Sequence, residues 1–173
     1  MNLRILSSFL KILVVLTVVA GTASNLLGVS EGSLELTPHE REAFADQFVH
    51  EKLALWQNRL QLQDWKISVI VSHPGDLRRG TLGNIHWDVG QMTATIRVLS
   101  AADHKGTFAA ALDDMEFTVV HELIHLELCP VTRTEENRSG ESRTAEENAV
   151  NRIAASFLHL EHRDEKPLHA ASN

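Results

Sequence analysis

The stretch FTVVHELIHLELCP, residues 117–130, places two histidines and a glutamate inside one of the most apolar runs of the chain. Its length and apolar pattern predict a helix that faces a hydrophobic core. Burying three ionisable groups in such a place without partners costs several kcal/mol. The stretch therefore predicts a functional site as well as a core helix.

The spacing of the two histidines is the spacing of a metal site. In an α-helix, residues four positions apart lie on one face, so His121 and His125 are expected to direct imidazole nitrogens at one ion. Glu122 would lie beside that ion, as in the HExxH motif, where the carboxylate takes a proton from zinc-bound water. Two readings without metal stay open: a surface helix, and a buried histidine pair satisfied by hydrogen bonds. The apolar Leu123 and Ile124 between the histidines favour the metal.

A third ligand must come from elsewhere in the chain, because a catalytic zinc ion normally has three protein ligands and a water. The single Cys129 excludes a site of several cysteines. Downstream, RTAEENAVNRIAASFL (residues 143–158) is expected to form a helix that carries the adjacent Glu146 and Glu147. Asn151 follows Glu147 by one turn on the same face, where its amide is expected to orient a ligand from outside.

With HExxH on one helix and a glutamate on the next, the sequence resembles the gluzincin branch of the zincin metallopeptidases. It is most similar to small single-domain members found in phages and mobile elements, including the ImmA/IrrE type. Their ligand glutamate stands in a pattern like E-x-x-A-N-x-F-A, which ENAVNRIA, residues 147–154, matches with two conservative replacements. The resemblance selects Glu147 as the third ligand. Glu146 remains the alternative, because two adjacent glutamates permit a slip of one residue.

The resemblance implies one Zn²⁺ per chain and hydrolysis of a peptide or protein substrate by zinc-bound water. Glu122 would act as general base and then as general acid. Two other classes stay open: a zincin-fold, zinc-binding module that holds a protein partner without turnover, and a zinc-free helix pair with structural histidines. Glu122 argues against both, because a structural site needs no general base there.

The predicted fold class is α+β, a zincin-like single domain over residues 37–162. Thr37, Pro38 and Glu40 predict the start of a long N-terminal helix, with a capping box. Three strands are expected at residues 65–72, 80–88 and 93–99, in a small antiparallel or mixed sheet. The last of them is a candidate edge strand that pairs with extended substrate.

The two site helices have predicted limits. Asp113, with Glu116 three residues later, is a candidate start for the HExxH helix, and Pro130 a candidate end. The glutamate helix is expected from about Ser142 to Leu160.

The N-terminal segment predicts export or membrane attachment. Arg4 and Lys11 precede an apolar run and small residues, so residues 1–23 are interpreted as a signal peptide or, alternatively, a membrane anchor. The protein would then be periplasmic, secreted or tethered through residues 4–23. Residues 24–36 are interpreted as a linker, and residues 163–173 as a disordered tail.

Composition supports a globular protein. Of the 173 residues, 43% are hydrophobic and 23% charged, with a net charge of −7 and scattered basic residues, so nucleic acid is not an expected partner. The chain has no tyrosine, although larger gluzincins often stabilise the oxyanion with Tyr or His. The candidates for that role, none of them assigned, are His86, His104, His159, Arg143 and Arg152. The tryptophans are expected to be core anchors and not substrate platforms, and they are Trp56, Trp65 and Trp87.

Overall fold

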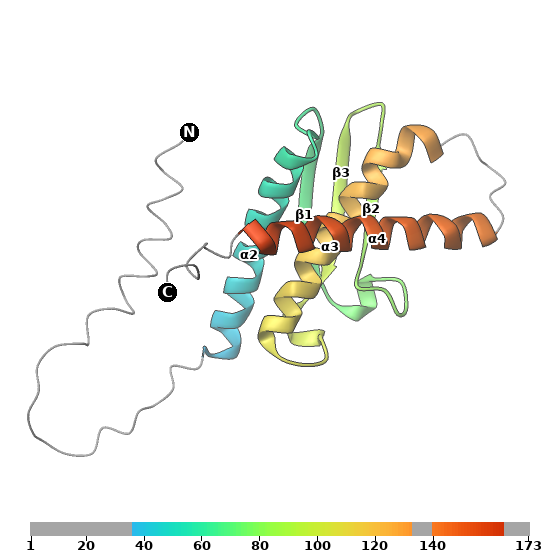
Figure 1. The fold of residues 1–173 in the computed structure, drawn as a ribbon. Coiled ribbons are helices and arrows are strands. Elements are labelled where there is room, and N and C mark those ends of the chain that lie inside the picture. Colours follow the sequence, from blue (N-terminus) through green and yellow to red (C-terminus); the bar gives the residue numbers. More distant parts are fainter. Residues whose placement is uncertain (1–35, 133–139, 165–173) are drawn as a thin grey trace, which may run out of the picture. The chain divides into compact units, whose positions relative to one another are not determined.

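The computed structural model describes residues 36–132 and 140–164 (Figure 1). Its elements are α2 (Pro38–Arg59), β1 (Lys66–Ser72), β2 (Gly83–Asp88), β3 (Thr93–Leu99), α3 (Phe108–Thr132) and α4 (Gly140–Asp164), with two short 3-10 helices at Pro74–Asp76 and Ala101–Asp103. The predicted α+β class is therefore confirmed, and the described residues belong to one compact unit.

The signal or anchor, the linker up to residue 35 and the tail from residue 165 lie outside the described residues. Over residues 36–132 and 140–164, no helix has both the length and the apolar character required to cross a membrane. Helix α4 continues to Asp164 and so extends beyond the predicted end at Leu160.

Helix α2 begins as predicted, with a complete capping box. The Thr37 hydroxyl accepts from the Glu40 N–H (3.3 Å), and the Glu40 carboxylate accepts from the Thr37 N–H (2.8 Å). Pro38 occupies the start of the helix, where a missing N–H is harmless. The inward face of α2 is buried through Ala45, Val49, Leu53 and Trp56.

The three strands form a mixed sheet in the order β1-β3-β2. Strand β3 pairs parallel with β1 and antiparallel with β2. The prediction of residues 93–99 as an edge strand is therefore wrong. The alternating Ala94, Ile96 and Val98 are buried, as suits a central strand, whereas β2 carries the exposed His86 and Asp88 and forms an edge.

Helix α3 differs from its predicted limits at both ends. It begins at Phe108 and not at Asp113, with the Thr107 hydroxyl accepting from the Ala110 N–H (3.2 Å). It also continues past Pro130 to Thr132. A proline in the last turn removes a hydrogen bond only at the end of the helix, which explains why it does not stop the helix there.

Glu116 is not a capping residue but part of a buried polar group. Its carboxylate is only 4% exposed and accepts from Trp56 Nε1 (2.8 Å) on α2. The other carboxylate oxygen pairs with Lys52 Nζ (2.8 Å), also on α2. These bonds satisfy Glu116 inside the core and connect α2 to α3.

The tryptophans pack in or against the core, as predicted, but Trp87 also lines the cavity described below. Trp56 is buried, and Trp65 and Trp87 are partly buried and pack against the hydrophobic cluster. Helices α2 and α3 lie against the sheet, and α4 crosses α3 in the view of Figure 1.

Gly83 allows the edge strand β2 to approach α3. A Cβ atom at this position would lie 2.4 Å from Thr118 Cγ2 and 2.5 Å from the carbonyl oxygen of Arg97. The second contact is with backbone, which cannot move away easily. A side chain here would therefore push β2 away from the helix that carries the HExxH motif.

We predict that Gly83→Ala lowers the free energy of unfolding by about 1–3 kcal/mol, as overpacking typically does. Chemical denaturation of the full-length protein measures this. Gly75→Ala is the matched control, because nothing lies within 4 Å of a Cβ atom at Gly75. Equal stabilities of the two variants would contradict the proposed close approach.

Candidate functional site

The two histidines of the HExxH motif face each other on α3. His121 and His125 lie one helical turn apart, with ring centroids separated by 4.7 Å. Their Nε2 atoms are 3.1 Å apart. Both side chains are mostly buried, with 15% and 13% exposed.

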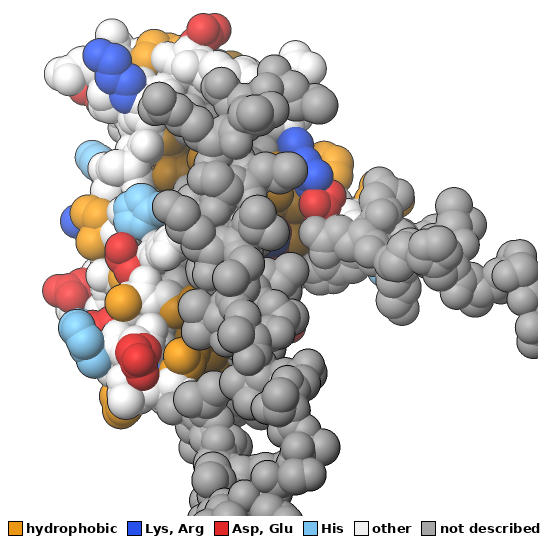
Figure 2. All heavy atoms as spheres, turned by 90° about the vertical axis from the view of Figure 1, so that its left-hand side faces the viewer, with side chains coloured by type: hydrophobic (Ala, Val, Ile, Leu, Met, Phe, Trp, Pro, Cys, Tyr) orange, Lys and Arg blue, Asp and Glu red, His pale blue; other side chains and the backbone are white. Residues whose placement is uncertain are grey.

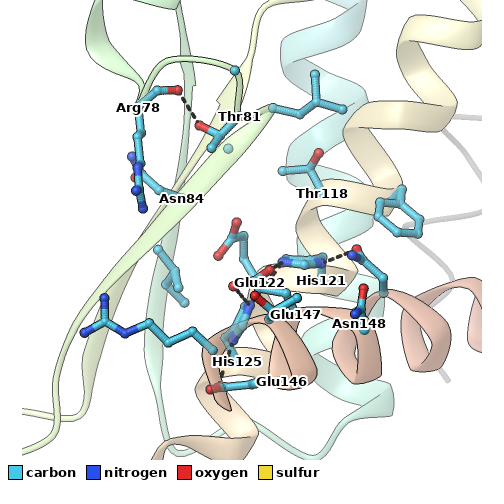
Figure 3. A pocket seen from close by; sticks show the side chains of 18 of the residues that line it. Arg78, Thr81, Asn84, Thr118, His121, Glu122, His125, Glu146, Glu147 and Asn148 are labelled. Carbon is cyan, nitrogen blue, oxygen red and sulfur yellow. Dashed lines mark hydrogen bonds and ion pairs between the residues drawn. The ribbon is translucent and has the colours of Figure 1, made fainter. Parts of the chain in front are cut away.

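Helix α4 adds the carboxylate of Glu147 to this pair (Figure 3). One of its oxygens lies 3.4 Å from His121 Nε2 and the other 3.4 Å from His125 Nε2. One donor atom from each of the three residues falls within 4.8 Å of the others. The structure thus brings together the two histidines with the glutamate that the resemblance selected.

Glu146 faces the other nitrogen of His125. Its Oε1 lies 3.4 Å from His125 Nδ1, away from the point where the Nε2 atoms meet. The adjacent glutamates therefore occupy different positions around the same imidazole. In this arrangement Glu146 orients His125, and Glu147 completes the cluster.

Asn151 lies where the sequence predicted it. His121 Nδ1 donates to Asn151 Oδ1 over 3.0 Å, which leaves the lone pair of His121 on Nε2. The carboxylate of Glu146 favours the same tautomer for His125. Both Nε2 lone pairs then point toward each other and toward the Glu147 carboxylate.

Three acceptors that converge without a donor repel one another unless a cation or a proton lies between them. Two imidazole nitrogens and one carboxylate are the ligands of a common catalytic zinc site, which leaves one position for water. The residues present therefore fit a divalent cation held by His121, His125 and Glu147. Burial, and then the neighbouring His125, lower the pKa of His121, which keeps its imidazole neutral, as a metal ligand must be.

Glu122 is a buried carboxyl group without a partner. It is 7% exposed and lines the cavity beside the cluster. Among residues 36–132 and 140–164 it makes no hydrogen bond or ion pair. Burial, and then the charge of Glu147, raise the pKa of Glu122 to about 8. A buried polar group without a partner requires an explanation.

The cluster opens into a cavity of about 860 Å³. That volume is within the range of ligand sites, about 300–1,000 Å³. Strand β2 and the preceding connection form one wall, α3 the floor and the first turns of α4 the other wall (Figure 3). The edge strand beside the cluster is therefore β2.

Of the candidates for an oxyanion partner, only Arg143 lines this cavity. His104 instead has a side chain 3% exposed, with its ring nitrogens facing Asp114 Oδ2 (3.2 Å) and the carbonyl of Leu99 (3.3 Å). His86, His159 and Arg152 are exposed side chains outside the cavity.

Sequence reasoning missed the residues that precede and begin β2. Arg78, Thr81 and Asn84 line the cavity (Figure 3), although no motif marks them. The glycines at positions 80 and 83 were the available signal, because they indicate a tight connection and a close backbone approach.

Comparisons with models of known protein families, with curated protein sequences and with solved structures gave no match to this chain.

We predict that Asn151→Ala weakens Zn²⁺ binding by about 10–100-fold, because His121 loses the group that fixes its tautomer. Competition titration with a chromogenic chelator measures the affinity. Asn148→Ala is the control, since Asn148 lines the same cavity without a bond to either histidine. If the Asn151 variant binds Zn²⁺ with unchanged affinity, Asn151 has no role in orienting His121.

The adjacent glutamates give a second comparison. Glu147→Gln is expected to weaken Zn²⁺ binding by about 100-fold or more, because a ligand is lost, and Glu146→Gln by only about tenfold. The same titration distinguishes the two residues. A larger loss of Zn²⁺ affinity in the Glu146 variant would make Glu146 the metal ligand and Glu147 the orienting residue.

Proposed function

We propose that this protein is a zinc-dependent metallopeptidase of the gluzincin type that binds one Zn²⁺ through His121, His125 and Glu147. The observation that carries the proposal is the buried carboxyl of Glu122, which has no partner and lies beside three convergent acceptors in an open cavity. A core helix gains no stability from such a group, whereas hydrolysis requires one.

The chain's own residues then have separate tasks. A bound zinc ion would supply the Lewis-acid chemistry that makes water acidic and polarises a carbonyl group. Glu122 accepts a proton from the attacking water on one carboxylate oxygen and returns it to the leaving amine. Burial raises the pKa of Glu122, so its carboxylate form is a stronger base, and a cation held beside it would favour that deprotonated form.

Asn151 and Glu146 hold the imidazoles of His121 and His125 in the orientation that directs both Nε2 atoms at one point. The edge strand β2 offers unpaired backbone groups along the cavity wall, where an extended peptide is able to add as a further strand. The substrate class that fits this surface is a peptide or an unfolded protein segment.

The competing proposal, a zinc module that binds a partner without turnover, explains the histidines and Glu147 equally well. It leaves Glu122 unexplained, because neither metal binding nor partner binding requires a buried, unpaired carboxyl beside the cluster. The peptidase proposal accounts for all four residues.

Glu122→Gln is expected to lower kcat/KM for peptide cleavage by about 100-fold or more, because the proton acceptor is removed, while bound zinc stays at one ion per chain. A peptide library with mass-spectrometric detection measures cleavage, and elemental analysis measures zinc. Glu127→Gln, an exposed position on the same helix outside the cavity, should keep both properties.

Chelation of the wild-type protein should abolish cleavage, and added zinc should restore it. Cleavage that resists chelation, or a purified protein that binds no zinc under zinc-replete conditions, would refute the proposal.

A further inference from the structure

Two arginines line the cavity beside the histidine–glutamate cluster. Arg78 lies in the connection before β2, and Arg143 in the first turn of α4. Both side chains are exposed. Within residues 36–132 and 140–164, neither guanidinium forms an ion pair or a side-chain hydrogen bond.

The two arginines reach the cavity from different elements. The start of β2 approaches Thr118, one turn before His121, and the Thr81 hydroxyl donates to the carbonyl of Arg78 (2.7 Å), so the Arg78 connection lies on the side of the cavity formed by β2 (Figure 3). Arg143 precedes Glu146, which faces His125, by three residues on α4. Both arginines therefore border the cavity into which the cluster opens.

The stability of α4 does not explain why a basic residue stands at position 143. The N-terminal turn of a helix carries a partial positive charge, which disfavours a basic side chain there. No carboxylate of the cavity pairs with it either: Glu146 and Glu147 are directed at the two histidines at distances of 3.4 Å, and Glu122 forms no ion pair within the described residues. Both guanidinium groups therefore remain available to a ligand.

The overall charge of the protein is negative, opposite in sign to that of the two arginines. The net charge is −7, and on the face shown in Figure 2 acidic side chains lie among apolar, histidine and basic side chains. Guanidinium groups bind carboxylates through two parallel hydrogen bonds and stay charged at any physiological pH. A pair of free guanidinium groups in the cleft of an acidic protein therefore favours an anionic ligand at this place.

We propose that the cleft selects acidic peptides, with Asp or Glu side chains near the peptide bond that lies at the cluster. Arg78 binds one carboxylate and Arg143 the other. This inference rests on the proposed peptidase function, since it names the substrate class of the same site. In this role the two arginines determine specificity and take no part in the chemical step.

A matched pair of quenched fluorescent peptides tests the proposal with the full-length, zinc-loaded protein. The peptides differ only in carrying Glu or Gln at two positions near the cleaved bond. The Glu peptide is expected to have a kcat/KM about tenfold higher, because it alone forms the charge-assisted pairs. Equal values for the two peptides overturn the proposal.

Substituting the arginines tests whether they cause the preference for the Glu peptide. Arg78→Gln and Arg143→Gln should each reduce the ratio of the two kcat/KM values, and the double variant should bring it close to one. The controls are Arg79→Gln, next to Arg78, and Arg152→Gln, on the same helix as Arg143; both are exposed and outside the cavity. A preference that survives in the double variant, or that is lost in the controls, overturns the assignment.

A binding measurement separates this inference from the proposed function. Fluorescence anisotropy of labelled Glu and Gln peptides on the Glu122→Gln protein needs no turnover, and the Glu peptide is expected to bind about tenfold more tightly at low salt. Tighter binding of the Glu peptide without cleavage under any condition removes only the peptidase proposal. Chelator-sensitive cleavage with no preference between the peptides in either assay removes only the inference on acidic substrates.

Discussion

The candidate site depends on the packing of α4 across α3. Val150 and Ala154 of α4 are fully buried, and they lie on the same helical stripe as Glu147 and Asn151, at spacings of three and four residues. Burying the apolar half of this stripe fixes the rotation of α4 about its axis. That rotation turns Glu147 toward the Nε2 atoms and Asn151 toward His121 Nδ1.

The same packing holds together groups that repel one another. The lone pairs of His121 and His125 converge with the Glu147 carboxylate, and Glu122 is buried beside them without a partner. Each of these features costs stability unless a ligand compensates for it. The apolar residues of α3 supply the compensation within the fold, among them Met115, Val119, Val120 and Leu123, all fully buried. Local conflict of this kind inside a well-packed core is typical of functional sites.

The other buried polar groups among residues 36–132 and 140–164 are satisfied. Glu116 is as deeply buried as Glu122, but it accepts from Trp56 and pairs with Lys52. His104 is nearly inaccessible, and both of its ring nitrogens face oxygen acceptors. The contrast between Glu116 and Glu122 within two turns of the same helix separates a structural carboxylate from a candidate catalytic one.

The sequence by itself determined the α+β class, the three strands, the capping box of α2 and the histidine pair, because these depend on local periodicity and on contacts within one helix. It did not determine the limits of α3, where a cap at Thr107 and continuation past Pro130 gave the helix more length. Asp113 and Glu116 match a capping box as a local pattern, and only the contacts to α2 show Glu116 as a core residue.

Only the tertiary structure decided which elements meet. It placed β3 in the centre and β2 at the edge beside the cluster, because strand order depends on which faces become buried and not on the strands' own sequences. It also placed Glu147 near Nε2 of His125 and Glu146 near Nδ1, positions that spacing alone left open. It brought Arg78 into one cavity with Arg143. These relations join residues far apart in the chain, and no local pattern encodes a distance between them.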